Sequence, residues 1–163
     1  MKGNAMIFRK ADASDAKTVL ALYRAVIGTP FCVWDESYPG ETEIQGDLAA
    51  GTLYVLARDG EVIGAISIVP ENETDNLDCW KVRENAREFA RVAVRPDCQQ
   101  QGLSFYLVDG VIRELKEQHT AAIHIAVAKS NIPAQKLYRK MGFDFCGEAD
   151  LFGNHYFLCE MIL

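Results

Sequence analysis

The stretch that most constrains this chain runs from Ala90 to Leu107, where a strand, a polar loop and a helix follow one another. The apolar run at its start ends before Pro96, which has no N–H with which to continue a sheet ladder. After the polar residues 97–101 the pattern becomes helical at Gly102, because apolar side chains then recur at three- and four-residue spacing. These side chains are Leu103, Leu107, Val108, Val111, Ile112 and Leu115.

A loop that ends in glycine between a strand and a helix is typical of anion sites. The first turn of a helix has N–H groups without helical partners, and the helix dipole favours negative charge there. Gly102 has no Cβ, so a phosphate can approach the main chain, and Gln99, Gln100 and Gln101 add neutral donors. An ordinary strand–helix turn has the same pattern, and no Gly-Lys-Ser/Thr follows, so this is not a Walker loop. The loop alone supports both interpretations.

A second stretch, residues 131–143, begins another helix after another strand. Asn131 is the expected N-cap, and Pro133 fits the first turn, where a missing N–H costs nothing. Gly142 is expected to end the helix. The residues predicted to share one face of it are Ala134, Leu137, Tyr138 and Met141.

Together the two stretches resemble the GCN5-related N-acetyltransferase (GNAT) family. Gln99-x-x-Gly102-x-Ser104 resembles its pyrophosphate loop, with Ser104 where the family usually has Gly or Ala. Residues 131–143 match its Asn-x-x-Ala-x-x-Leu-Tyr-x-x-x-Gly-Phe segment without a gap. The resemblance covers the chain in order from Ile7 to its end, and its specific part is residues 92–143.

The resemblance implies an α/β (α+β) fold with a mixed, mostly antiparallel sheet of about seven strands, helices on both faces and splayed fourth and fifth strands. It implies an enzyme that transfers an acetyl group from acetyl-CoA directly to a primary amine, small or peptide-borne, in a ternary complex. Pantetheine would pair with the main chain of residues 92–94 like an added strand. The cofactor-binding residues implied are Val92, Ala93, Val94, Gln99, Gln100, Gln101, Gly102, Leu103, Ser104, Asn131 and Tyr138. The alternative is a CoA-binding sensor or interaction module without catalysis.

Acetyl transfer from a thioester needs an oxyanion donor, a base for the amine and an acid for the departing thiolate. Backbone N–H groups near residues 92–94 are candidates for the oxyanion donor. Tyr138 matches the family's proton donor to the CoA sulfur, and a phenol with an ordinary pKa of about 10 is a competent acid toward an alkyl thiolate. Without the flanking motif, Tyr138 would be interpreted as a core tyrosine.

The candidates for the base are Glu88, His124 and His155. Glu88 is placed on the strand face that also carries Val92 and ranks slightly ahead, yet each of the three side chains also has a purely structural interpretation. Some ribosomal-protein N-terminal acetyltransferases of the family carry Glu on the fifth strand where this chain has Ala126, which counts against that specific function. Cys98 is not expected to be a nucleophile, because it belongs with the pyrophosphate loop.

Residues 31–40 are aromatic and acidic without a clean period. In the resembled family this connector and the first two helices form one wall of the acceptor pocket. Trp34, Asp35, Glu36 and Tyr38 would then help to select the acceptor. The preferred interpretation is that Trp34 and Tyr38 pack the loop onto the core, since large aromatic side chains usually do so.

The net charge of −6 argues against nucleic-acid binding, which needs a basic face, and mildly favours a cationic acceptor. No apolar run reaches membrane-spanning length, and the N-terminus has no signal-peptide core, so neither a membrane nor secretion is expected. Five cysteines without Cys-x-x-Cys argue against a disulfide framework or a metal site and favour reduced cytoplasmic thiols. We expect one domain over residues 1–163, and the resemblance allows a homodimer.

The remaining elements are predicted from periodicity and turn signals. Ser14 or Asp15 is the expected cap of the first helix, the Asp59-Gly60 pair predicts a hairpin, and residues 70–80 are expected to be a polar loop. On the central strand, Glu88, Ala90, Val92 and Val94 are expected to face one way and Phe89, Arg91 and Ala93 the other. The predicted strands are 6–10, 53–58, 62–69, 84 or 86 to 94, 121–128, 143–146 and 156–163; the predicted helices are 14 or 15 to 27, 41–50, 102–115 and 131–141.

Overall fold

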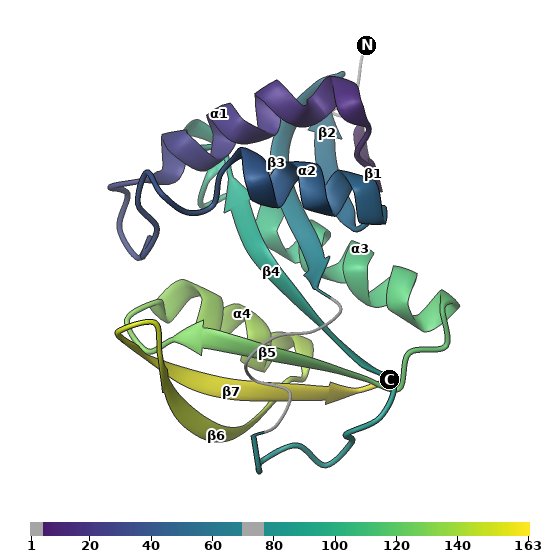
Figure 1. The fold of residues 1–163 in the computed structure, drawn as a ribbon, viewed down its shortest axis with the longest axis vertical. Helices are drawn as coiled ribbons and strands as arrows, with labels where there is room; N and C mark the ends of the chain where they lie inside the picture. The colour runs from purple at the N-terminus through teal and green to yellow at the C-terminus, as the bar shows by residue number, and fades with distance from the viewer. Residues whose placement is uncertain (1–4, 70–76) are drawn as a thin grey trace. The chain divides into compact units, whose positions relative to one another are not determined.

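The computed structural model describes residues 5–69 and 77–163, and its elements follow the predicted order β-α-α-β-β-β-α-β-α-β-β (Figure 1). The chain divides into two compact units: unit 1 is Met1–Ile68 with Ala90–Ile112, and unit 2 is Val69–Phe89 with Arg113–Leu163. The expectation of one domain stays a prediction. The strands are β1 (Met6–Lys10), β2 (Leu53–Arg58), β3 (Glu61–Val69), β4 (Ala86–Val94), β5 (Ala122–Ala128), β6 (Asp144–Leu151) and β7 (Asn154–Ile162). The α-helices are α1 (Ala16–Val26), α2 (Glu41–Ala50), α3 (Leu103–Glu117) and α4 (Ile132–Met141).

The strands form a seven-stranded sheet in the order β1-β2-β3-β4-β5-β7-β6. The pairs β1–β2, β2–β3, β5–β7 and β6–β7 are antiparallel, whereas β4 and β5 are parallel. The β4–β5 ladder joins Ala86 to Ala122 and Arg87 to Ile123, at the beginning of both strands. This is the mixed, mostly antiparallel sheet that the family resemblance implies.

In unit 1 the two faces of β2 bury different partners. Leu53 and Val55 belong to a core cluster with α1 and α2, whose buried members include Val19 and Ile44. The alternate residue Tyr54 stacks on Phe8 of β1, with ring centroids 5.3 Å apart. Helix α3 approaches Phe8 through Gly110, where a Cβ would lie 2.6 Å from the ring. Glycine at 110 is therefore required by the close approach of α3 to β1.

The N-cap position of α1 is Asp15, one of the two predicted residues, but its side chain makes no capping bond to α1. Asp12 precedes a 3-10 turn, Ala13–Asp15, and its carboxylate accepts a hydrogen bond from the Ser14 N–H at 2.8 Å. Asp15 instead accepts from the main-chain N–H of Asp12 and from the Arg9 guanidinium, both within 3.0 Å. The side-chain capping bond is therefore made at the preceding 3-10 turn by Asp12, which the prediction did not name.

In unit 2, β7 lies between β5 and β6, and α4 follows β5 in the chain (Figure 1). The prediction ended the sixth strand at Cys146 and left residues 147–155 as a connection, which is wrong. Strand β6 continues to Leu151 and turns at Phe152-Gly153, both with positive φ, into β7 at Asn154. Strand β6 has no fully buried residue, so its alternation of apolar and polar residues is too weak to reveal a strand.

Strand β4 also departs from the predicted alternation. Arg91 has φ +53°, a left-handed conformation that interrupts the extended backbone, and Ala93 and Val94 are both buried in succession. The expected single face shared by Glu88, Val92 and Val94 is therefore wrong beyond Arg91.

Of the predicted polar loop 70–80, residues 70–76 lie outside the described part of the chain. None of the helices that the structure describes is long and apolar enough to cross a membrane.

Candidate active site

The predicted pyrophosphate loop lies in unit 1, between β4 and α3. Residues 99–102 are exposed, and Gln100 and Gly102 have φ of +64° and +75°. Such left-handed residues before a helix orient main-chain N–H groups toward one side, as in anion-binding nests. A Cβ built on Gly102 meets no atom within 4 Å, so the space beside this residue is open. The main chain of this loop is therefore accessible to an anion.

Two of the loop's glutamine side chains are already engaged. The Gln99 amide donates to the carbonyl of Val94 at 3.1 Å, and the Gln101 carbonyl accepts from the Arg58 guanidinium at 3.0 Å. Arg58 also approaches the buried Cys98 sulfur at 3.2 Å. The glutamines shape the loop, while Arg58 is a cation that sequence reasoning missed. It comes from β2, 43 residues from Gln101, and no local pattern marks it.

Arg91, at the irregular position of β4, forms a nearly buried ion pair with Asp47 of α2. Its Nη2 lies 2.7 Å from the Asp47 carboxylate, and the exposed fractions of the two side chains are 11% and 13%. Arg91 also donates to the Tyr38 hydroxyl at 3.1 Å, and Asp47 accepts from the Ser67 hydroxyl at 2.7 Å. Although burial opposes the charge, these hydrogen bonds and the Asp47 charge raise the pKa of Arg91 above its ordinary value. The pair ties α2 to β4.

The connector between α1 and α2 contacts the Arg91–Asp47 pair through the Tyr38 hydroxyl. Trp34 packs edge-on against the buried Tyr23, with ring centroids 5.5 Å apart, as the packing interpretation expects. Asp35 accepts from the N–H of Ser37 at 2.7 Å and so forms a local turn. Tyr38 stays 43% exposed. A role of Trp34, Asp35, Glu36 and Tyr38 in acceptor selection stays a prediction.

Tyr138 lies in unit 2, on α4, and is 7% exposed. It forms an aromatic cluster with Phe89 and Phe143, at centroid distances of 5.8 and 5.6 Å. Burial, and secondarily the nearby Cys159, raise the pKa of the Tyr138 hydroxyl above its ordinary value. The phenol is therefore protonated throughout the physiological pH range, as an acid must be before it acts.

The start of α4 is fixed by two amides. Asn131 accepts a hydrogen bond from the Ala134 N–H at 3.2 Å, which confirms its predicted capping role. Gln135, which the sequence analysis did not single out, is buried and donates to the carbonyls of Ala128 and Lys129 at 3.0 and 2.8 Å. These bonds secure the passage from β5 into α4, and with it the position of Tyr138 within unit 2.

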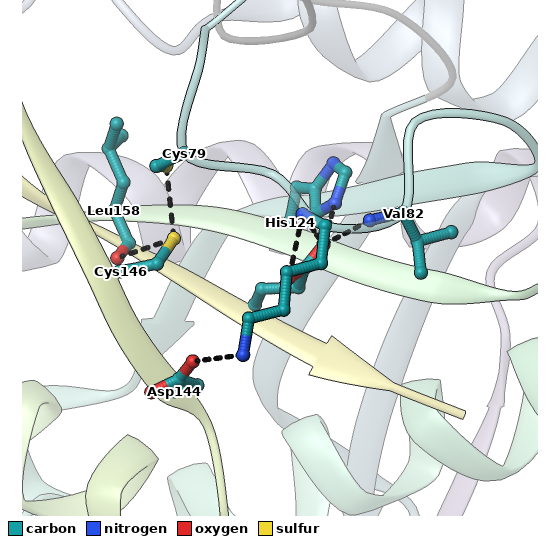
Figure 2. A network of polar contacts seen from close by, with 8 residues as sticks. Cys79, Val82, His124, Asp144, Cys146 and Leu158 are labelled. Carbon is teal, nitrogen blue, oxygen red and sulfur yellow. Dashed lines mark hydrogen bonds and ion pairs between the residues drawn. The ribbon is translucent and has the colours of Figure 1, made fainter.

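His124, one of the predicted bases, is 3% exposed and lies in a buried network (Figure 2). Its Nε2 is 2.9 Å from the carboxylate of Glu160, its partner across the β5–β7 ladder, and its ring stacks on Trp80 at 4.0 Å. Glu160 also accepts from the N–H groups of Lys81 and Val82 within 3.1 Å. Burial alone would raise the pKa of Glu160, but these hydrogen bonds and His124 lower it overall. The network fastens residues 80–82 to β7.

The other candidate bases differ in exposure. Glu88 is half-buried on β4 and has an interaction partner. His155 is 73% exposed and pairs with Asp150 across the β6–β7 hairpin. Ala126 lies on β5 and pairs with Leu158. Among residues 5–69 and 77–163, no group of three or more His, Cys, Asp or Glu is arranged to hold a metal ion.

Comparison with known proteins agrees with these motifs. The model of the acetyltransferase (GNAT) family matches residues 19–143, which include both the 99–104 loop and the Tyr138 segment. The chain belongs to the GNAT family. It is an acetyl-CoA-dependent N-acetyltransferase, so the resemblance inferred from the two sequence stretches is confirmed.

Curated relatives of this acetyltransferase act on different amines. It is 25% identical over 156 residues to an L-methionine sulfoximine/L-methionine sulfone acetyltransferase of Pseudomonas paraeruginosa, covering 91% of this chain and 86% of that one. It is 38% identical over 65 residues to the ribosomal protein bS18-alanine N-acetyltransferase of Escherichia coli, covering 40% and 42%. The fold of yncA from Salmonella typhimurium, solved with its cofactor acetyl-CoA, matches with a TM-score of 0.79 at 18% identity over 98% and 94% of the chains.

Proposed function

We propose that this acetyltransferase acetylates an α-amino group, that of a free amino acid or of a peptide N-terminus. The observation that carries the proposal is the state of His124. Its Nε2 contacts Glu160 and its ring is covered by Trp80, so it serves the packing of unit 2 instead of accepting a proton from an amine. An enzyme without this base favours an acceptor whose amine loses its proton easily.

The energetics of deprotonation separate the two acceptor classes. At pH 7 the neutral form of a lysine-like amine, with a pKa of about 10.4, costs about 4–5 kcal/mol. An α-amine with a pKa of about 7.7–8.0 costs about 1 kcal/mol. L-Methionine sulfone and alanine, named as acceptors of the Pseudomonas and Escherichia coli relatives described above, both carry an α-amine, whereas a probable spermine N(1)-acetyltransferase of Bacillus subtilis, 27% identical over 110 residues, names an acceptor without one. Ala126, where some ribosomal-protein N-terminal acetyltransferases of the family carry glutamate, favours the free amino acid over the ribosomal peptide.

The donor side of the proposal rests on unit 1. The residues around the 99–104 loop fit a pyrophosphate, because open space beside Gly102, left-handed backbone at Gln100 and a helix N-terminus occur together. Arg58, held against Gln101, would add a positive charge to these main-chain donors. The main chain of residues 92–94 would hold the pantetheine arm and donate to the thioester oxygen.

The acid is Tyr138. The neutral amine attacks the thioester carbon, which forms the C–N bond, and the C–S bond then breaks with its electron pair on sulfur. Tyr138 donates its hydroxyl hydrogen toward that sulfur, and water accepts the proton that the nitrogen loses. Because burial raises the pKa of Tyr138, the hydroxyl remains the hydrogen donor up to at least about pH 10.

The test measures CoA thiol released from acetyl-CoA with four acceptors: L-methionine sulfone, a peptide beginning with alanine, an N-blocked peptide with one lysine, and spermine. We expect kcat/KM at pH 7 to be at least about 100-fold higher for the α-amines, as the difference in deprotonation cost allows. NMR of acetylated L-lysine, which offers both amines, should find the acetyl group on the α-nitrogen. Release with lysine side chains or spermine alone would refute the proposed acceptor class.

A further inference from the structure

Two cysteines from distant parts of the sequence meet in unit 2. The sulfur atoms of Cys79 and Cys146 are 3.0 Å apart, although 67 residues separate them in the chain. Figure 2 shows Cys146 between Cys79 and Leu158, with its sulfur toward both. We propose that this pair is a modification site, a dithiol that peroxides or small-molecule disulfides oxidise reversibly to a disulfide.

The fold places Cys146 in the position that the pair requires. Phe145 pairs with Cys159 and Gly147 with Leu158, so the β6–β7 register shifts between them and Cys146 is the extra residue of a bulge. The neighbouring Gly147 leaves room for Cys79, because a Cβ there would lie 3.0 Å from the Cys79 Cβ and 3.2 Å from its sulfur. The bulge directs the Cys146 thiol toward Cys79, and Gly147 leaves space for this contact. The fold therefore brings these two thiols together specifically.

Cys79 is held on the other side by the buried network of His124. Trp80, next in the chain, stacks on His124, and the N–H groups of Lys81 and Val82 donate to Glu160. The segment that carries Cys79 is thus fixed on β7, the strand that pairs with β6. Both sulfurs are presented by anchored main chain, and a shortening of about 1 Å joins them at the disulfide length of about 2.05 Å.

The remaining cysteines differ from this pair. Cys98 and Cys159 are buried, and Cys32 is half-buried in unit 1. Cys79 and Cys146 are both half-buried, so small oxidants have access to them. Burial, together with the hydrogen bond to Cys79, raises the pKa of the Cys146 thiol, which disfavours its thiolate, so the first attack is written from Cys79.

With hydrogen peroxide the step balances as follows. The Cys79 thiolate attacks one peroxide oxygen, the O–O bond breaks, and hydroxide leaves while Cys79 becomes a sulfenic acid. The Cys146 sulfur then attacks the Cys79 sulfur, the S–S bond forms, and water leaves with the Cys146 proton. The two sulfurs lose two electrons in all, and one peroxide becomes two waters. A dithiol reductant reverses the bond by exchange.

The experiment treats the reduced, folded enzyme with stoichiometric hydrogen peroxide, then unfolds it in iodoacetamide to alkylate every remaining thiol, and maps the peptides without reduction. We expect a loss of about 2 Da, a crosslink between the peptides of Cys79 and Cys146, and a fall from five reactive thiols to three. The disulfide closes a chain loop between Cys79 and Cys146, so oxidation should raise Tm by at least about 5 °C. Reduction with dithiothreitol should reverse this rise. Cys32→Ser, a half-buried cysteine outside the pair, should behave like the wild type.

Cys79→Ser and Cys146→Ser should each lose the crosslink and the rise in Tm. Oxidation of urea-unfolded protein should scatter the crosslinks over other cysteine pairs, because only the fold selects this one. The proposal is refuted if the folded wild type gives no 79–146 crosslink, or if either serine variant still loses about 2 Da as readily as the wild type.

Discussion

The two units of this acetyltransferase present their functional groups in opposite ways. In unit 1 the 99–102 loop is exposed, and what it presents is main chain with open space beside Gly102. In unit 2 the candidate acid Tyr138 is 7% exposed inside an aromatic cluster, and Gln135 on the same helix is also buried. Main-chain donors bind an anion from solvent, whereas a phenol is already protonated at neutral pH, so the burial of Tyr138 fixes the position of its hydroxyl.

Each unit also secures its geometry with one charged contact of low exposure. Arg91–Asp47 in unit 1 is 11% and 13% exposed and ties helix α2 to the irregular point of β4. His124–Glu160 in unit 2 is 4% and 1% exposed and ties residues 80–82 to β7. In both units these low-exposure charged side chains hold the main chain, while the chemistry that we propose uses Tyr138 and backbone N–H groups.

The largest effect is expected from breaking the pair of unit 1. Arg91→Ala leaves the Asp47 carboxylate nearly buried without its cation, and removing one partner of such a pair costs about 3 kcal/mol of unfolding free energy. Urea denaturation followed by circular dichroism measures this loss. Arg95→Ala, just beyond β4, is the matched control; its side chain is 36% exposed and pairs with the largely exposed Asp97, so this change should shift the midpoint far less. Equal losses of unfolding free energy in the two variants would show that the Arg91–Asp47 pair stabilises the protein no more than the ion pairs of Arg95 do.

The His124–Glu160 pair of unit 2 predicts that the free energy of unfolding depends on pH. The pKa of Glu160 is lowered in the folded state, so its contribution to stability is present above the unfolded pKa of about 4.3 and is lost as pH falls through the folded value. Glu160→Gln should destabilise the protein by about 2 kcal/mol at pH 7, and the difference should shrink as pH falls below the unfolded pKa of about 4.3 toward the lower folded value. Thermal unfolding of both proteins across this range measures it.

The exposed pair Asp150–His155 is the matched control for that prediction, since it is also a carboxylate opposite a histidine on paired strands. Asp150→Asn should change stability by less than about 1 kcal/mol. A Glu160→Gln deficit that persists unchanged at pH 3 would contradict the assigned role of the carboxylate charge.

The smallest of these effects concerns the loop. Gly102→Ala places a methyl group in the space assigned to the phosphate and strains a residue at φ +75°, so KM for acetyl-CoA should rise about tenfold with kcat little changed. Gly60→Ala, at φ +85° with equally open surroundings, carries the same strain in the β2–β3 turn. Steady-state kinetics should find its KM unchanged. Equal KM increases in both variants would refute a phosphate site at Gly102.

Much of this arrangement could be predicted from local pattern. The Asp59-Gly60 hairpin, the capping of α4 by Asn131 and the strand–loop–helix at Gly102 all depend on neighbouring residues, and all are confirmed. Strand β6 was not predicted beyond Cys146, because none of its residues is buried: Glu148 and Asp150 are exposed, and the residues beside them are only half-buried.

Side-chain contacts between residues far apart in the sequence could not be predicted from local pattern. Arg58 meets Gln101 from 43 residues away, and Glu160 meets His124 from 36. The one available signal was Glu160 itself, a single carboxylate inside the apolar run 157–162. A charge in such a run requires a buried partner, and the ladder made His124 that partner.

The most direct test of the account is the kinetics of Tyr138→Phe beside Tyr23→Phe. Both tyrosines are buried, and the Tyr23 hydroxyl has no hydrogen-bond partner in the described part of the chain, so its removal controls for the loss of a buried hydroxyl. The account predicts that Tyr138→Phe lowers kcat at least about tenfold while acetyl-CoA affinity barely changes, and that Tyr23→Phe retains kcat. An unchanged kcat in Tyr138→Phe would remove Tyr138 from the mechanism.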